Sequence, residues 1–232
     1  MLETRPGRLE GSGDPAVTSS EARPLSAPSI PRRRAVALVV LGFLVAGALV
    51  GAVWAALAPP AHGVVALTKS GDRIYAYLGA EADHFFVAAF LMLGMLCVLA
   101  VTGAAAAWQW RAHRGPLMVF GLSLGAIGAG GVAALVGGLL VRAQYDAIDV
   151  AGAPVSPEHR VHYVTEAPSV FFGHTPLQIA TSLLVPAAAA AMVYAIAAVA
   201  TPRDDLGGHP PVEGIVLRSP VVTVDGGEAP VR

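Results

Sequence analysis

Titratable side chains gather in two polar segments of this 232-residue chain, residues 58–84 and 142–176. These segments hold five of the seven histidines and seven of the sixteen acidic residues. Imidazole and carboxylate groups are ligands of Zn²⁺, and three or four of them make a zinc site. The pattern therefore suggests a metal-binding or proton-sensing site, with Glu166 as a further acid and with these candidate ligands: Glu81, Asp83, His84, His159, His162 and His174.

The same residues also have a simpler structural interpretation. His159 and His162 would share one face of a helix, but the residues around them alternate as in a strand, where positions three apart point to opposite faces. This argues against the pair as joint ligands. Asp83 precedes a long apolar run, where its carboxylate is well placed to cap a helix. We therefore expect these groups to serve as caps and hydrogen-bond partners, and we expect no resident cofactor.

One catalytic pattern occurs, in a context that does not suit it. Gly121-Leu122-Ser123-Leu124-Gly125 matches the G-x-S-x-G pattern of serine hydrolases, which positions a nucleophile only at a strand-to-helix turn. Here it lies within an apolar run, and no apolar run contains a histidine to act as the base. The sequence has no phosphate-binding loop, no H-E-x-x-H motif and no C-x-x-C pair. The one motif that occurs and the three that are absent therefore give no indication of an enzyme.

The composition indicates a membrane protein. Apolar residues make up 55% of the chain and charged residues only 13%, whereas a soluble domain carries about 25% charged residues. The mean hydropathy is +0.62. A net charge of −1 excludes a nucleic-acid-binding protein with a basic face, and the single cysteine, Cys97, excludes a disulfide within the chain.

Four stretches without Asp, Glu, Lys or Arg are long enough to span a bilayer, which takes about 20 residues per helix. They cover residues 35–57, 85–108, 116–141 and 177–200, and arginine and aromatic residues flank them as at membrane interfaces. We predict an all-α membrane protein in which residues 31–201 form a four-transmembrane-helix bundle with outer loops at 58–84 and 142–176. Residues 1–30 and 202–232 are rich in Pro, Ser, Gly and Glu and are expected to be disordered cytoplasmic tails.

The basic residues favour one orientation. Eleven of the fifteen fall on the side of the termini and four fall in the two outer loops, so the positive-inside rule places both termini in the cytoplasm of a plasma-membrane protein. In an alternative interpretation the first apolar run is a secretory signal cleaved after Ala58. That run is longer than the usual 7–15 residues of a signal core, which favours an uncleaved anchor.

The outer loops contain β-prone runs. Residues 64–68 and 73–78 flank a Ser-Gly turn and predict a hairpin. Residues 160–165 alternate as a strand does and could add a third strand, since a lone hairpin is marginal in water. We therefore expect a small extracytoplasmic cap of hairpin and loops on the helices.

Small residues indicate how the helices pack, because they allow transmembrane backbones to approach closely. They recur at four-residue spacing in the first and third spans, and the candidate packing positions are Gly47, Gly51, Gly121, Gly125, Gly130 and Gly138. We expect the third helix at the centre of the bundle, beside the first. The same stripe would also suit a homo-oligomer or a second membrane protein. Pro186 lies in the middle of the fourth span, where it removes a backbone donor and predicts a kink.

Several segments resemble an uncharacterised family of actinobacterial, mycobacterial-type four-span membrane proteins, a domain of unknown function. Characteristic runs are Trp108-Gln109-Trp110-Arg111 and Phe171-Phe172-Gly173-His174-Thr175-Pro176, and the resemblance also covers residues 58–68, 77–86 and 154–163. It extends over about residues 35–206. The resemblance implies a plasma-membrane protein and supplies no activity, substrate or catalytic residue.

These observations lead to three functional hypotheses. The first is a non-enzymatic accessory or scaffold protein of the cell envelope, which lies in the lipid bilayer and binds another envelope membrane protein or a second copy of itself through the outer cap. The second is a carrier of a small molecule or lipid, with a cavity beneath the cap near Pro186. The third is an extracytoplasmic metal-binding protein or enzyme that uses the histidines named above.

Overall fold

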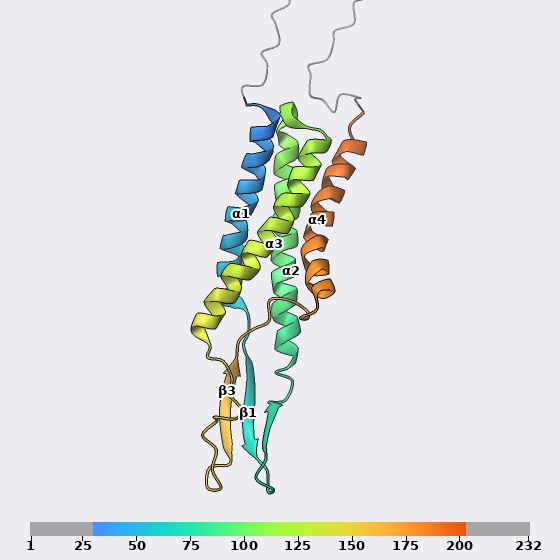
Figure 1. Cartoon of the computed structure of the whole chain (residues 1–232). Helices are drawn as coiled ribbons and strands as arrows, with labels where there is room; N and C mark the ends of the chain where they lie inside the picture. Colours follow the sequence, from blue (N-terminus) through green and yellow to red (C-terminus); the bar gives the residue numbers. More distant parts are fainter. Residues whose placement is uncertain (1–29, 203–232) are drawn as a thin grey trace, which may run out of the picture.

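The computed structural model describes residues 30–202, so the predictions for the two tails lie outside it. Four long helices form one part of the chain and a small sheet lies beyond one end of them (Figure 1). The helices are α1 (Arg32–Leu57), α2 (Asp83–Gln109), α3 (Pro116–Gln144) and α4 (Pro176–Val199), with a short 3-10 turn at Arg111–His113. Both described ends of the chain lie away from the sheet, which defines a sheet end and a termini end.

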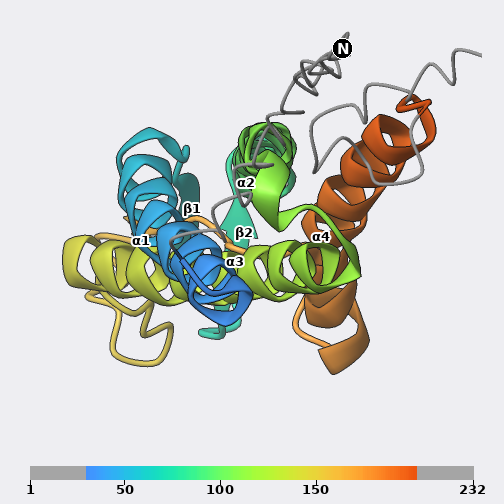
Figure 2. The same ribbon diagram turned by 90° about the horizontal axis from the view of Figure 1, so that it is seen from above.

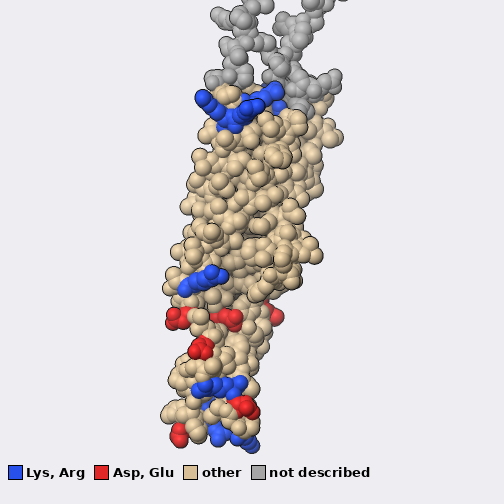
Figure 3. Space-filling view, viewed as in Figure 1, with Lys and Arg blue, Asp and Glu red and all other residues tan. Residues whose placement is uncertain are grey.

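Each of the four helices is long and apolar enough to cross a membrane. Their ends lie within three residues of the predicted spans. Figure 3 shows a broad belt without acidic or basic side chains on the visible face, and large side chains such as Leu41, Leu135 and Ile196 point outward from the helices. An apolar outer surface of this extent is typical of a surface that contacts lipid. The mostly helical fold with four apolar helices is thus as the sequence predicts.

Helix α3 makes its most extensive contact with α1. A Cβ atom placed on Gly47 would lie 2.5 Å from the carbonyl oxygen of Ala129, and one on Gly51 would collide with the backbone of Ala133. No side chain fits in such a space, so the two backbones meet directly. This is the close approach that small residues permit between helices in lipid.

The other candidate packing glycines differ in their surroundings. Gly121 and Gly125 also face α1, where Val36 and Phe43 fill the space beside them, and Gly130 faces Leu183 of α4. Gly138 differs from these glycines, because a Cβ atom there would meet nothing within 4 Å in the described chain. Helix α3 contacts all three other helices, and a part for Gly138 in helix packing stays a prediction.

Helix α4 is continuous through Pro186, whose side chain is buried. The hydroxyls of Thr181 and Ser182 donate to the carbonyls of Leu177 and Gln178, which are one turn before the carbonyl that Pro186 leaves free. The expected kink stays a prediction. The helix starts with a capping box between Thr175 and Gln178, which satisfies the first backbone donors and sets where α4 begins.

The sheet contains three antiparallel strands in the order β2-β1-β3. They are β1 (Ala61–Leu67), β2 (Arg73–Tyr77) and β3 (Val161–Glu166). The turn between β1 and β2 is closed by the bond from the Asp72 amide to the Thr68 hydroxyl, 2.9 Å long, and Gly71 supplies its positive φ of 90°. Residues 161–166 therefore provide the third strand of a hairpin-based sheet, one residue later than the predicted run of residues 160–165.

Candidate functional site at the junction of sheet and helices

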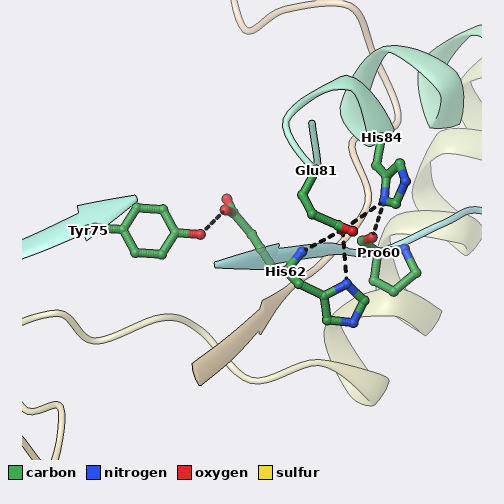
Figure 4. A network of polar contacts seen from close by, with 6 residues as sticks. Pro60, His62, Tyr75, Glu81 and His84 are labelled. Atoms are coloured by element: carbon green, nitrogen blue, oxygen red, sulfur yellow. Dashed lines mark hydrogen bonds and ion pairs between the residues drawn. The ribbon is translucent and has the colours of Figure 1, made fainter. Parts of the chain in front are cut away.

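A hydrogen-bonded cluster around Glu81 joins β1 to the start of α2 (Figure 4). The Oε2 atom of Glu81 accepts the backbone N–H of His62 at 3.0 Å and lies 2.9 Å from Nδ1 of the same histidine. His84 approaches that oxygen from α2, with its Nδ1 3.0 Å away, and the same nitrogen lies 2.8 Å from the carbonyl oxygen of Pro60. Since both neighbours of this nitrogen are acceptors, His84 carries a proton on Nδ1.

The cluster favours the ionised form of Glu81. Hydrogen bonds from the His62 side chain and backbone lower the pKa of the Glu81 carboxyl, and the charge of His84 adds to them. The carboxylate is therefore ionised at neutral pH. Its role in the described chain is to join three segments, the strand β1, the turn before α2 and the first turn of α2.

The structure brings together only part of the predicted metal site. Glu81 and His84 meet, and their third partner is His62, which was not among the candidate ligands. The nitrogen-to-oxygen distances of 2.9 and 3.0 Å are those of hydrogen bonds around one carboxylate oxygen. Within residues 30–202, no group of three or more His, Cys, Asp or Glu side chains could hold a metal ion.

The remaining candidates lie apart from this cluster. Asp83 is the first residue of α2 rather than its cap, since Ala82 occupies the cap position and no side chain caps the helix. His159 is exposed in the loop before β3, and His162 lies within β3 as the partner of Val65. His174 is exposed just before α4. These positions do not form a common site.

A second cluster centres on Glu166, the last residue of β3. The hydroxyls of Tyr75 and Tyr77 both donate to its Oε2 atom at 3.0 Å. The two tyrosines share one face of β2 because they are two residues apart, and Gly63 of β1 leaves the space that the Tyr75 ring occupies. Burial raises the pKa of Tyr75, and the Glu166 carboxylate raises it further.

The two faces of the sheet differ. Ala61, Gly63 and Val65 are buried on one face, where Arg73 also donates to the carbonyl of Ala153 in the loop after α3. The other face, here called the open face, has no acidic or basic residue other than a histidine; its positions are His62, Val64, Ala66, Ile74, Ala76, Val161, Tyr163 and Thr165. Ile74 and Val161 are 50% exposed and Tyr163 is 70% exposed. The open face is thus an apolar surface without a cover in the described chain.

Two cavities lie on either side of the segment 167–174, which connects the sheet to α4. One, of about 520 Å³, is lined mainly by aromatic side chains of α2 and of this segment, with Glu166 at its wall. The other, of about 710 Å³, lies between α3, α4 and the same segment. The junction therefore offers pockets that combine apolar walls with a few polar groups, as ligand sites do.

Sequence reasoning missed His62, Tyr75 and Tyr77 as members of these clusters. The tyrosines carried a usable signal, because alternation along β2 places both on one face. No sequence pattern indicated the role of His62, because its contact with Glu81 depends on the path of the chain from the end of β2 to the start of α2.

The structure has four helices that could span a membrane and a small sheet with polar clusters at one end. These features are typical of a multi-pass membrane protein. The chain belongs to the family described as "Protein of unknown function (DUF2567)", whose model matches residues 43–208. This membership confirms the resemblance found from the sequence.

The relatives are uncharacterised mycobacterial proteins. The chain is 53% identical over 175 residues to an uncharacterized protein of Mycobacterium tuberculosis, and the aligned region covers 75% of this chain and 91% of the relative. It is 51% identical over 191 residues to an uncharacterized protein of Mycobacterium leprae, and the aligned region covers 82% of this chain and 96% of the relative. No solved structure matches the chain.

Proposed function

We propose that this chain is a multi-pass plasma-membrane protein that acts as a non-enzymatic accessory or scaffold protein of the cell envelope. It binds a second envelope protein through the open face of the sheet. The observation that carries this proposal is the exposure of Ile74, Val161 and Tyr163 on a face whose described positions include no acidic or basic residue other than His62. Contiguous exposed apolar side chains in water mark protein interaction sites.

The location of the open face supports a protein partner. The strands extend beyond the helices (Figure 1) and away from the apolar belt (Figure 3), so the face lies in water when the belt lies in lipid. The outer edges of β2 and β3 have no strand partner in the described part of the chain, and such edges accept an extended segment of another protein. The proposed partner therefore presents an apolar β-segment outside the membrane.

The proposed orientation places the sheet outside the cytoplasm and both termini inside. It rests on the excess of basic residues on the side of the termini. Labelling intact cells with a membrane-impermeant maleimide tests it. A Lys69→Cys, Cys97→Ala variant is expected to react in intact cells, and an Arg111→Cys, Cys97→Ala variant only after permeabilisation. The reverse pattern would contradict the orientation.

Site-specific photocrosslinking tests the proposed function. A photoreactive phenylalanine analogue in place of Tyr163 is expected to give one discrete adduct with another envelope protein in intact cells. Ile74→Asp, on the opposite edge strand of the same face, should abolish that adduct. The same analogue in place of Glu158, which is exposed in the loop before β3, serves as the control and should give none.

Two results would contradict the proposed function. Equal adducts from positions 158 and 163 would show that the open face has no preference for a partner. An adduct of twice the mass of the chain would assign the face to a second copy of this protein rather than to another envelope protein.

A further inference from the structure

The larger cavity lies where α3 and α4 separate. The two helices approach each other towards the termini end and diverge towards the sheet end, in both the side view and the view from above (Figures 1 and 2). The segment 167–174 passes between them, and the cavity of about 710 Å³ lies among these three elements. Its volume falls in the range of roughly 300–1,000 Å³ typical of ligand pockets.

The lining of this cavity divides into two chemical parts. One part is apolar and comes from α3 and α4, with Leu135, Gly138, Leu139 and Ile179. The other part contains Arg142, Ser169 and His174. None of the residues between 30 and 202 that line the cavity is acidic. A ligand that matches both parts has an apolar tail and an anionic head.

The basic groups of the cavity are available to a ligand. The guanidinium of Arg142 and the ring of His174 form no hydrogen bond or ion pair with the other described residues, 30–202. Arg142 lies in the last turn of α3, where the apolar stretch of this helix ends. Arginine at that level of a transmembrane helix lies among lipid headgroups.

The apolar part of the cavity is open to the lipid-facing side of the helices. Leu135 is 62% exposed and Leu139 is 58% exposed, and a Cβ atom on Gly138 would meet nothing within 4 Å. A hydrocarbon chain can therefore lie along α3 at this point. A soluble anion would use Arg142 and His174 but would leave this surface uncovered.

We propose that the groove between α3 and α4 binds one anionic phospholipid of the surrounding bilayer. Its phosphate contacts Arg142 and His174, and one acyl chain lies over Gly138 between Leu139 and Ile179. Arginine binds phosphate through charge-assisted hydrogen bonds, and basic pockets between transmembrane helices hold anionic headgroups. This inference does not depend on the proposed scaffold function, since it concerns a different surface.

Native mass spectrometry of the full-length protein tests the inference. The protein, purified in detergent, is titrated with phosphatidylglycerol or with phosphatidylcholine of the same acyl chains. We expect one phosphatidylglycerol per chain to be retained in preference to phosphatidylcholine. Arg142→Gln should weaken that retention about tenfold, the factor expected from the loss of one charge-assisted hydrogen bond.

Two glycine variants form a matched pair for the apolar part. Gly138→Leu fills the groove and should reduce phosphatidylglycerol retention by a similar factor. Gly131→Leu, also on α3 and also without neighbours within 4 Å, does not line the cavity and should leave retention unchanged. Because a Cβ atom at either position meets nothing within 4 Å in the described chain, both variants are expected to fold as the natural chain does.

Three results would overturn the inference. Equal retention of the two lipids would show that the anionic headgroup is not recognised. Equal effects of the two glycine variants would show that the lipid does not bind in this groove. Glycerol phosphate lacks acyl chains. If it displaced phosphatidylglycerol at the same concentration as the lipid, Arg142 and His174 would be a site for a soluble anion rather than for a lipid.

Discussion

The helical region and the sheet region of this chain are held together by different means. In the helical region α1 and α3 meet backbone to backbone at Gly47 and Gly51, and the contact depends on the absence of side chains. In the sheet region two carboxylates, Glu81 and Glu166, each accept hydrogen bonds from residues distant in the sequence. The stability of the first region therefore depends on shape, whereas that of the second depends on the ionisation of its side chains.

The largest expected effect comes from filling the α1–α3 contact. Gly47→Leu places a side chain where the Ala129 backbone lies, so the helices must separate, and we expect a loss of about 3 kcal/mol or more in the free energy of unfolding. Thermal or denaturant unfolding in detergent measures this loss. Gly42→Leu is the matched control on α1, because a Cβ atom on Gly42 meets nothing within 4 Å. Equal destabilisation by the two variants would show that the close approach is not what holds these helices.

An intermediate effect is expected from Glu81 and is confined to the sheet region. The pKa of Glu81 is lowered in the folded chain, so its stabilising contribution is complete above the ordinary value of 4.5 and is lost as the pH falls through the folded-state value. Glu81→Gln should remove this dependence. We expect it to speed hydrogen exchange at the His62 amide several-fold and to leave exchange in the helices unchanged.

Asp83→Asn is the control for Glu81, since Asp83 lies two residues away and its side chain does not cap α2. It should leave exchange at His62 as it is in the natural chain. If the protection of the His62 amide, measured relative to an unfolded chain at the same pH, still fell on acidification in the Glu81→Gln variant as in the natural chain, another group would be responsible for the pH dependence.

The smallest effect is expected from Glu166. Burial, followed by the Glu166 carboxylate, raises the pKa of Tyr75, so the associated stability is present below the ordinary tyrosine value of 10.0 and is lost as the pH rises through the folded-state value. Glu166→Gln should lower the pKa of Tyr75 only in part, because burial remains. Ultraviolet titration of the tyrosines measures this change. A Tyr75 transition unaltered by Glu166→Gln would contradict the hydrogen bond.

The sequence predicts the two regions to different extents for a physical reason. The four helices follow from apolar runs whose length and lack of charge are local properties of the chain. Alternation along residues 73–77 likewise predicts the face that Tyr75 and Tyr77 share. The contact of both tyrosines with Glu166 and that of His62 with Glu81 depend on strand register and on the return of the chain, which no local pattern encodes.

The glycine stripes show the same limit. Their spacing identifies residues that can approach a neighbouring helix, but not which residues do so. Gly47 and Gly51 meet α3, whereas Gly138 belongs to the same kind of repeat and remains open. The difference arises because α3 crosses α1 closely along its length and diverges from α4 towards the sheet.

The pairing of β1 with β3 has a consequence for the order of biosynthesis. Ala61 pairs with Glu166, so the two strands close a loop that contains the whole of α2 and α3. If these helices cross a membrane, two crossings return the chain to the side it left, and the strands lie on one side when both helices cross but not when only one does. A chain in which only one of α2 and α3 crossed the bilayer would hold β1 and β3 on opposite sides, so their pairing requires the two helices to insert together.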